Sequence, residues 1–290
     1  MHLTKSPYIE PQAYNQTVSL LREFFLAKGF VETPTQSRLS ILAACEDPTT
    51  IATYEYSGQI WPLPQTGQMW LEHELLKSPE TPGFFCISTS YRQEPNPVEG
   101  RHETIFPMFE FETKGGLKEL EALERELLVH LGFAENEEDF ASGDYTDVAK
   151  EYGVMDICGT TEGKICKDKG SVFFLKNFPQ YTSPFWNMKK NGENANKIDV
   201  LLYGMETIGS AERSSNPDEM REMFYSISGG EYAGILFRKF GRERVERELE
   251  EFLSYDFFPR FGGGIGITRM MRALSLLAEE QNNNLELIAA

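Results

Sequence analysis

The chain has 290 residues, of which 40% are hydrophobic, and a formal net charge of −17 at pH 7. This length supports a sizeable core, and the negative charge opposes a general attraction to nucleic-acid phosphates, although a local basic cleft is compatible with it. The four cysteines form no CxxC pair and the four histidines do not cluster with them, which argues against a disulfide framework or a zinc site. The sequence has neither an apolar run of about 18 residues nor a signal peptide, so we expect a cytoplasmic protein that does not enter a membrane.

In chain order, the pattern begins with a helix at residues 11–28 that ends at Gly29. An extended segment at 55–63, a helix at 67–76 and a long β-hairpin follow. The remaining predicted elements are helices at 117–131 and 146–151, strands at 171–178 and 197–204, helices at 217–224 and 241–253, a glycine-rich turn at 261–266 and a last helix at 267–280. Strands and helices do not alternate strictly, which favours an α+β fold with an antiparallel sheet, and no domain boundary is evident.

The hairpin carries its charges on one face. Phe85 and Ile87 alternate on one face of the incoming strand, as Ile105, Phe109 and Phe111 do on the outgoing strand, which predicts a core face. The other face and the loop carry Arg92, Glu94, Arg101, His102, Phe106, Met108, Glu110 and Glu112. This face is either solvated or built to bind an anion, because its arginines and His102 concentrate positive charge.

Two further segments suggest chemistry. The glycines of FGGGIGITR permit close backbone approach directly before a helix, although a glycine-rich turn more often has a purely structural role. If Leu202 and Tyr203 form a tight turn, Asp199 lies opposite Glu206, and two facing carboxylates favour a cation such as Mg²⁺ between them. The alternative is a pair of solvent-exposed hairpin residues.

Together these segments resemble the catalytic domain of the class II aminoacyl-tRNA synthetases, in the aspartyl and asparaginyl group. The second motif of that family stands here as Arg92, Glu94, Arg101, His102 and Phe106. The third motif is matched by GGGIGITR, and the first is matched loosely by residues 14–34. The acidic pair of the family and the arginine that follows it are matched by Asp199, Glu206 and Arg213. The resemblance implies an antiparallel sheet of six or seven strands flanked by helices, in one catalytic domain over residues 1–290.

The resemblance also implies an ATP site with Mg²⁺. The residues implied in ATP binding are Arg92, Glu94, Arg101, His102, Phe106, Glu206, Gly264, Gly266 and Arg269. Arg92 and Arg269 are the expected catalytic residues: Arg92 would stabilise the α-phosphate, while Arg269 would hold the outer phosphates and cover the adenine opposite Phe106. Asp199 and Glu206 would hold the metal.

For the amino acid, the resemblance implies that Gln68 and Glu110 receive the α-ammonium and that Arg213 reads the side-chain oxygen. The aspartyl enzymes have a lysine three residues after that glutamine, and here the position is Leu71, which favours asparagine over aspartate. Lys189, Lys190 or a water could still reach the same oxygen. Family members usually have Glu before the adenine-stacking Phe, whereas this chain has Ile105.

The resemblance further implies a homodimer through residues 14–34. The N-terminal anticodon-binding barrel of the full synthetases is not expected in this sequence. We therefore expect a ligase that activates asparagine or aspartate and passes the acyl group to a small acceptor such as ammonia. One alternative is a truncated ligase that transfers the acyl group to tRNA, which is not favoured, or to a protein. The other is a non-catalytic paralogue that binds ATP or an amino acid.

Overall fold

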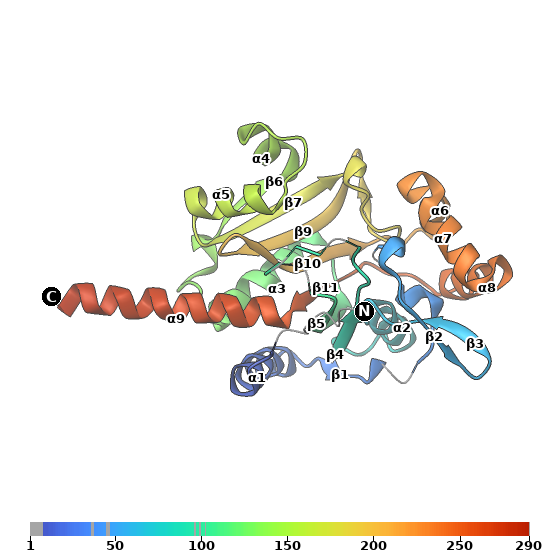
Figure 1. Ribbon diagram of the computed structural model, residues 1–290, viewed down its shortest axis with the longest axis horizontal. Helices are drawn as coiled ribbons and strands as arrows, with labels where there is room; N and C mark the ends of the chain where they lie inside the picture. Colours follow the sequence, from blue (N-terminus) through green and yellow to red (C-terminus); the bar gives the residue numbers. More distant parts are fainter. Residues whose placement is uncertain are drawn as a thin grey trace.

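The computed structural model describes residues 8–35, 38–44, 47–95, 97–98, 100–101 and 103–289, with side chains to residue 283. Its main sheet has nine strands in the order β1-β4-β5-β11-β10-β9-β7-β6, with β8 paired to β9 (Figure 1). Their bounds are β1 Val31–Glu32, β4 Gly83–Tyr91, β5 Ile105–Lys114, β6 Ala141–Asp144, β7 Val172–Pro179, β8 Lys190–Asn191, β9 Asn194–Leu202, β10 Met205–Arg213 and β11 Arg260–Gly266.

The expected antiparallel sheet is confirmed in its centre. All neighbours from β4 through β5, β11, β10 and β9 to β7 pair antiparallel. The short edge strands β1 and β6 pair parallel to β4 and β7, and these, with β8, raise the strand number above the six or seven expected.

One face of the sheet packs against helices α1 (Pro11–Ala27), α3 (Leu117–His130) and α9 (Ile267–Ala289). The ring of Phe25 on α1 lies 5.0 Å from that of Phe109 and 5.1 Å from that of Phe111. Phe85 stacks on Phe109 at 5.0 Å, as the period-2 pattern predicts. Ile105 is an exception at 46% exposure, because it lies at the loop end of β5, beyond the helices.

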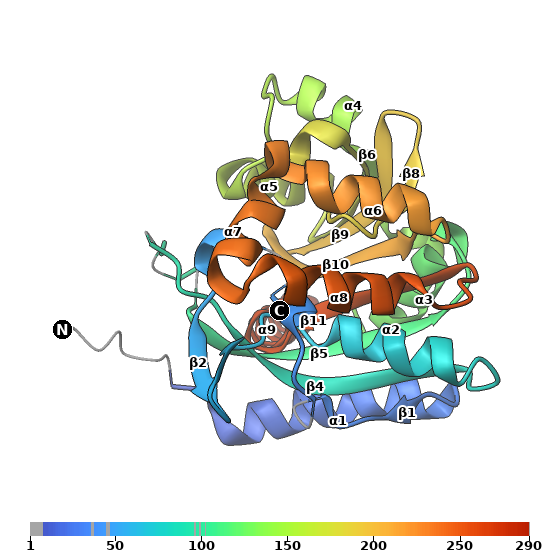
Figure 2. The same cartoon turned by 90° about the vertical axis from the view of Figure 1, so that its right-hand side faces the viewer.

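A second core lies beside the sheet, where Trp186 is surrounded by α6 (Pro217–Ser226), α7 (Glu231–Phe240) and α8 (Arg242–Leu253). Figure 2 shows these helices next to α2 (Gln68–Lys77) and the hairpin of β2 (Thr53–Tyr56) and β3 (Gln59–Pro62). A third cluster joins α4 (Tyr145–Glu151) and α5 (Gly159–Lys169) to β7. The sequence pattern did not predict α5, α7 or β6.

The stretch predicted as a glycine-rich turn is the buried central strand β11. A Cβ at Gly262 would overlap the carboxylate of Glu112, and one at Gly263 would lie 2.6 Å from Cβ of Ser210. The glycines therefore leave room for side chains of both neighbouring strands, which explains why an apolar alternation is missing from this strand.

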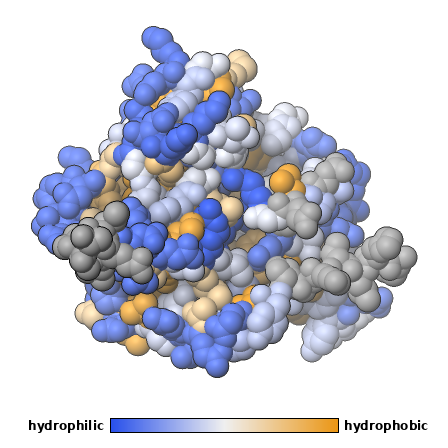
Figure 3. Space-filling model, turned by 60° about the vertical axis from the view of Figure 1, so that its left-hand side comes forward, coloured by the Kyte–Doolittle hydropathy of each residue, from blue (hydrophilic) through white to orange (hydrophobic). Residues whose placement is uncertain are grey.

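The far half of α9 extends beyond the body of the molecule (Figure 1). Figure 3 shows a mainly hydrophilic face with hydrophobic residues in small separate groups. Within the part of the chain that the structure describes, no helix is long and apolar enough to cross a membrane.

Candidate active site

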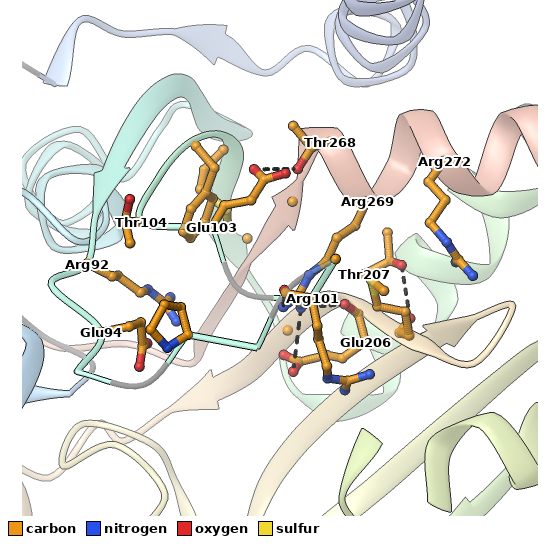
Figure 4. A pocket seen from close by; sticks show the side chains of 18 of the residues that line it. Arg92, Glu94, Arg101, Glu103, Thr104, Glu206, Thr207, Thr268, Arg269 and Arg272 are labelled. Carbon is orange, nitrogen blue, oxygen red and sulfur yellow. Dashed lines mark hydrogen bonds and ion pairs between the residues drawn. The ribbon is translucent and has the colours of Figure 1, made fainter. Parts of the chain in front are cut away.

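A cavity of about 950 Å³ opens on the sheet face opposite α1, α3 and α9. It lies over β5, β11 and β10, between the end of β4 and the first turn of α9 (Figure 4). Predicted site residues that line it are Gln68, Arg92, Glu94, Arg101, Phe106, Glu206, Gly264, Gly266 and Arg269. The fold thus brings together residues that are up to 201 positions apart, Gln68 and Arg269 among them.

Arg92 and Phe106 form one side of this cavity. The guanidinium of Arg92 lies 5.4 Å from the ring centroid of Phe106, because β4 and β5 pair Ser90 with Phe106. The backbone of Arg92 is fixed by a 2.8 Å hydrogen bond to the carbonyl of Thr104. Arg92 and Glu94 lie together on this side in Figure 4.

Arg101 and Arg269 lie across the cavity. Arg269 donates to the backbone carbonyl of Glu206 at 2.6 Å and to that of Arg101 at 3.3 Å. Arg101 is ion-paired with Glu162 on α5, which the sequence did not single out. His102 lies outside the described residues. The cavity therefore has cationic groups on two sides and can receive a polyanion between them.

The acidic pair is arranged differently from the expectation. The β9–β10 turn is formed by Tyr203 (φ 50°) and Gly204 (φ 78°), and Asp199 pairs with Gly209 rather than with Glu206. A β-bulge between Glu206 and Ile208 turns the Glu206 side chain to the face of Gly209. The position of a Cβ on Gly209 is 3.0 Å from Oε1 of Glu206 and 3.6 Å from Oδ1 of Asp199, so the carboxylates still approach each other.

Asp199 is held by Lys197, whose Nζ donates to Oδ2 at 2.7 Å. Oδ1 is buried and has no hydrogen-bond partner among the described residues. Burial raises the pKa of Asp199 to about 7, and repulsion by Glu206 adds to the rise against the attraction of Lys197. A cation between Oδ1 and Glu206 would satisfy this oxygen, so the two residues fit a metal. The described residues contain no cluster of three His, Cys, Asp or Glu ligands, so the other ligands must come from substrate or water.

A second cavity of about 420 Å³ adjoins the first and shares Gln68, Glu206 and Gly209 with it. Arg213 lines it and is 3% exposed. Its guanidinium donates to both oxygens of Glu112, at 3.1 and 3.0 Å, and to Oε1 of Gln68 at 2.8 Å. Burial raises the pKa of Glu112 to about 7, against the attraction of Arg213.

Beneath this cavity, Arg260 pairs with Glu72. Nε and Nη2 of Arg260 donate to Oε2 of Glu72 at 2.9 and 2.7 Å, and both residues are 0% exposed. Asn187 donates to the other oxygen of Glu72 at 2.6 Å. The sequence reasoning missed this pair, because neither residue belongs to a motif that it used.

Glu110 lines neither of these two cavities, and its expected contact with the substrate ammonium stays a prediction. It is 0% exposed, and its carboxylate accepts a 2.7 Å hydrogen bond from the Gly67 backbone and further bonds from the hydroxyls of Thr66 and Ser88. Glu110 therefore holds the start of α2, and with it Gln68, from behind.

Leu71 is also turned away from the cavities. It is 0% exposed and packs with Leu75, Phe84 and Cys86, so its apolar nature reflects the core and says nothing about the substrate. Lys189 pairs with Glu212 at 2.7 Å. The lysine that does line the second cavity is Lys197, which the sequence reasoning missed although it lies two residues before Asp199 on the same strand face.

Comparison with known proteins gives a consistent result. The family described as "tRNA synthetases class II (D, K and N)" matches residues 12–282. The aspartate–tRNA(Asp/Asn) ligase of Methanopyrus kandleri is 24% identical over 303 residues, which cover 92% of this chain and 65% of that protein. The cytoplasmic aspartate–tRNA ligase of Rattus norvegicus is 24% identical over 290 residues, 87% of this chain and 54% of that protein.

Among solved structures, the asparaginyl-tRNA synthetase of Pyrococcus horikoshii complexed with asparaginyl-adenylate has a TM-score of 0.74 at 18% identity. The match covers 91% of this chain and 64% of that one. The chain therefore spans less than two thirds of the length of each of these three proteins.

Proposed function

Because the chain belongs to the class II tRNA synthetases for aspartate, lysine and asparagine, in the aspartate and asparagine group, we propose that it activates asparagine or aspartate with ATP. The observation that carries the proposal is the junction of two cavities at Gln68, Glu206 and Gly209. The larger cavity has the arginines for a triphosphate, and the smaller one has room for an amino acid. Their shared wall allows an α-carboxylate to meet an α-phosphate.

In the proposed reaction, a carboxylate oxygen of the amino acid attacks the α-phosphorus of ATP. The bond from this phosphorus to the bridging oxygen breaks, and pyrophosphate leaves as the aminoacyl adenylate forms. Arg92 binds the α-phosphate and stabilises its developing charge, and Arg101 and Arg269 hold the outer phosphates. Phe106 covers one face of the adenine. Glu94 lines the same cavity beside Arg92 (Figure 4) and meets the adenine edge.

Asp199 and Glu206 are the proposed holders of Mg²⁺, which the family generally uses. The unpartnered Oδ1 of Asp199 beside Glu206 supports this assignment. When bound, the metal neutralises part of the phosphate charge. Gln68 and Arg213 orient the amino acid, and the charge of Arg213 disfavours a cationic side chain such as that of lysine.

The proposed acceptor of the acyl group is a small nucleophile such as ammonia. The net charge of −17 supports this choice over tRNA, because it lowers the general affinity for phosphates. The first alternative is transfer of the acyl group to tRNA or to a protein. The second alternative is a non-catalytic role in binding ATP or an amino acid.

We also propose that this catalytic domain forms a homodimer in the cytoplasm. Leu26 at the end of α1 and Val31 on β1 are 54% and 47% exposed, and a two-fold partner would cover them. The similarity to the cytoplasmic rat ligase supports the location.

The test is ATP–pyrophosphate exchange with each of the twenty amino acids, followed by acceptor assays with ammonia and with bulk tRNA. We expect exchange with asparagine or aspartate and none with lysine. Exchange with no amino acid would contradict the proposal and favour a binding role. Exchange followed by transfer to tRNA would change the acceptor but keep the activation step.

A further inference from the structure

The second cavity contains a cation beside Arg213 that no predicted role uses. Lys197 lies on β9, and its amine reaches the cavity wall between the Phe178 ring and the Asp199 carboxylate. Nζ is 3.8 Å from the ring centroid of Phe178. The amine also forms an ion pair with Oδ2 of Asp199 at 2.7 Å.

The strand register places Lys197 between the acidic pair and Arg213. Asp199 pairs with Gly209 where the two cavities meet, and Lys197 pairs with Ala211, one step farther along the same sheet face. Arg213 is the next residue of β10 on that face. An amino acid whose α-carboxylate lies at the junction therefore extends its side chain past Lys197 toward Arg213.

Lys197 has bonding capacity left for a ligand. An ammonium group has three N–H donors, and among the described residues Lys197 makes one hydrogen bond, to Asp199. We propose that Lys197 is a specificity-determining residue that, with Arg213, binds the side-chain carboxylate of the substrate and selects aspartate over asparagine. This inference rests on the proposed activation of these two amino acids.

The selection follows from donor and acceptor chemistry. A carboxylate offers an acceptor oxygen to each of the two cations, whereas the amide of asparagine offers one oxygen and turns an NH₂ donor toward the other cation. The chain thereby supplies from β9 the second positive charge that Leu71, buried in the core, does not supply.

The test measures binding of L-aspartate and L-asparagine by calorimetry in the presence of a non-hydrolysable ATP analogue. We expect wild-type protein to prefer aspartate. Lys197→Met should weaken aspartate binding roughly 10- to 100-fold, the effect of one lost charge-assisted contact, and should change asparagine binding much less. Retained asparagine binding also shows that the variant is folded.

Two further variants complete the design. Lys197→Arg keeps the charge and should retain the preference for aspartate. Lys189→Met is the matched control, because Lys189 also pairs with a buried carboxylate, that of Glu212, but lies outside both cavities. It should bind both amino acids as wild type does.

Equal weakening of aspartate and asparagine binding in Lys197→Met would overturn the inference, and so would a wild-type preference for asparagine. In both cases pyrophosphate exchange would still support the proposed function. If the wild-type protein neither binds these two amino acids nor exchanges pyrophosphate with them, the proposed function fails and the assignment of Lys197 fails with it.

Discussion

The two cavities hold their arginines in opposite ways. In the larger cavity, Arg101 and Arg269 are 22% and 31% exposed; Arg101 is ion-paired with the mostly buried Glu162, and Arg269 is tied mainly to backbone carbonyls. Around the smaller cavity, Arg213 and Arg260 are at most 3% exposed, and each is paired with a fully buried carboxylate. A partly exposed arginine can move to a phosphate at little cost, whereas a buried pair fixes its geometry before the substrate arrives.

This contrast has a consequence for mutations. Changes in the larger cavity should affect activity with little loss of stability. Changes around the smaller cavity should affect folding as well, because they leave a buried charge without its partner.

Arg260→Met should give the largest effect. Removing one member of a buried ion pair costs about 3–5 kcal/mol, because the carboxylate of Glu72 stays buried and loses the two bonds from Arg260. Urea unfolding measures the loss. Arg221→Met is the matched control on the surface, where Arg221 pairs with Glu250 at 2.8 Å, and should cost under about 1 kcal/mol. Similar losses in both variants would refute the contrast.

Arg92→Ala should leave stability nearly unchanged and lower pyrophosphate exchange about 100- to 1000-fold, equivalent to about 3–4 kcal/mol of transition-state stabilisation. Urea unfolding checks the expected stability, and pyrophosphate-exchange kinetics on the same preparation check the expected loss of activity. Near-normal turnover would rule out the assigned role of Arg92.

Glu124 is a buried carboxyl on the other face of the sheet, the face that α1, α3 and α9 cover. It lies on α3 and is 0% exposed, and the hydroxyl of Ser210 is the hydrogen-bonding group beside its carboxyl. Burial, with repulsion by Asp199, raises its pKa from 4.5 to about 8. Between pH 4.5 and about pH 8 the folded state holds a proton on Glu124 that the unfolded state has released. The free energy of unfolding therefore falls by about 1.4 kcal/mol for each unit by which the pH rises.

Glu124→Gln keeps a neutral side chain at every pH and should remove this dependence, which urea unfolding from pH 5 to 8 would detect. Glu126→Gln, a change at a partly exposed position on the same helix, is its matched control. The same slope in wild type and Glu124→Gln would show that the buried group does not hold its proton.

Asp199→Asn and Glu206→Gln should have the smallest effect, raising the Mg²⁺ concentration for half-maximal exchange roughly tenfold, with less change in amino-acid binding. A magnesium titration of the exchange rate measures this. An unchanged titration in both variants would refute a shared metal site.

The sequence predicted the parts of the fold that depend on periodicity. Phe85, Phe109 and Phe111 lie in the core as their alternation indicates, and the first helix ends at Ala27, two residues before the predicted stop at Gly29. Strand β11 was not predicted, because glycines carry no apolar signal. The turn between β9 and β10 was predicted at Leu202 and Tyr203, one residue before its observed position at Tyr203 and Gly204.

The candidate site was predicted in its residue types more than in its geometry. Motif spacing identified Arg92, Arg269 and Arg213, and all three line the two adjoining cavities. Motif spacing could not predict that the Glu110 side chain is buried and lines neither cavity, because its burial depends on the side chains of neighbouring strands. Lys197 was missed because it belongs to no motif.

The bulge in β10 makes the number of residues between Glu206 and Arg213 important for the site. In a regular strand, Glu206 and Arg213 would face opposite sides of the sheet because an odd number of steps separates them. The extra residue, Thr207, corrects this, and Glu206 then shares a face with Gly209 and Arg213. Deleting or inserting one residue here would separate the proposed metal ligand from the proposed amino-acid pocket, whereas exchanging Thr207 for another residue would preserve the count. This segment should therefore tolerate substitutions better than changes in length.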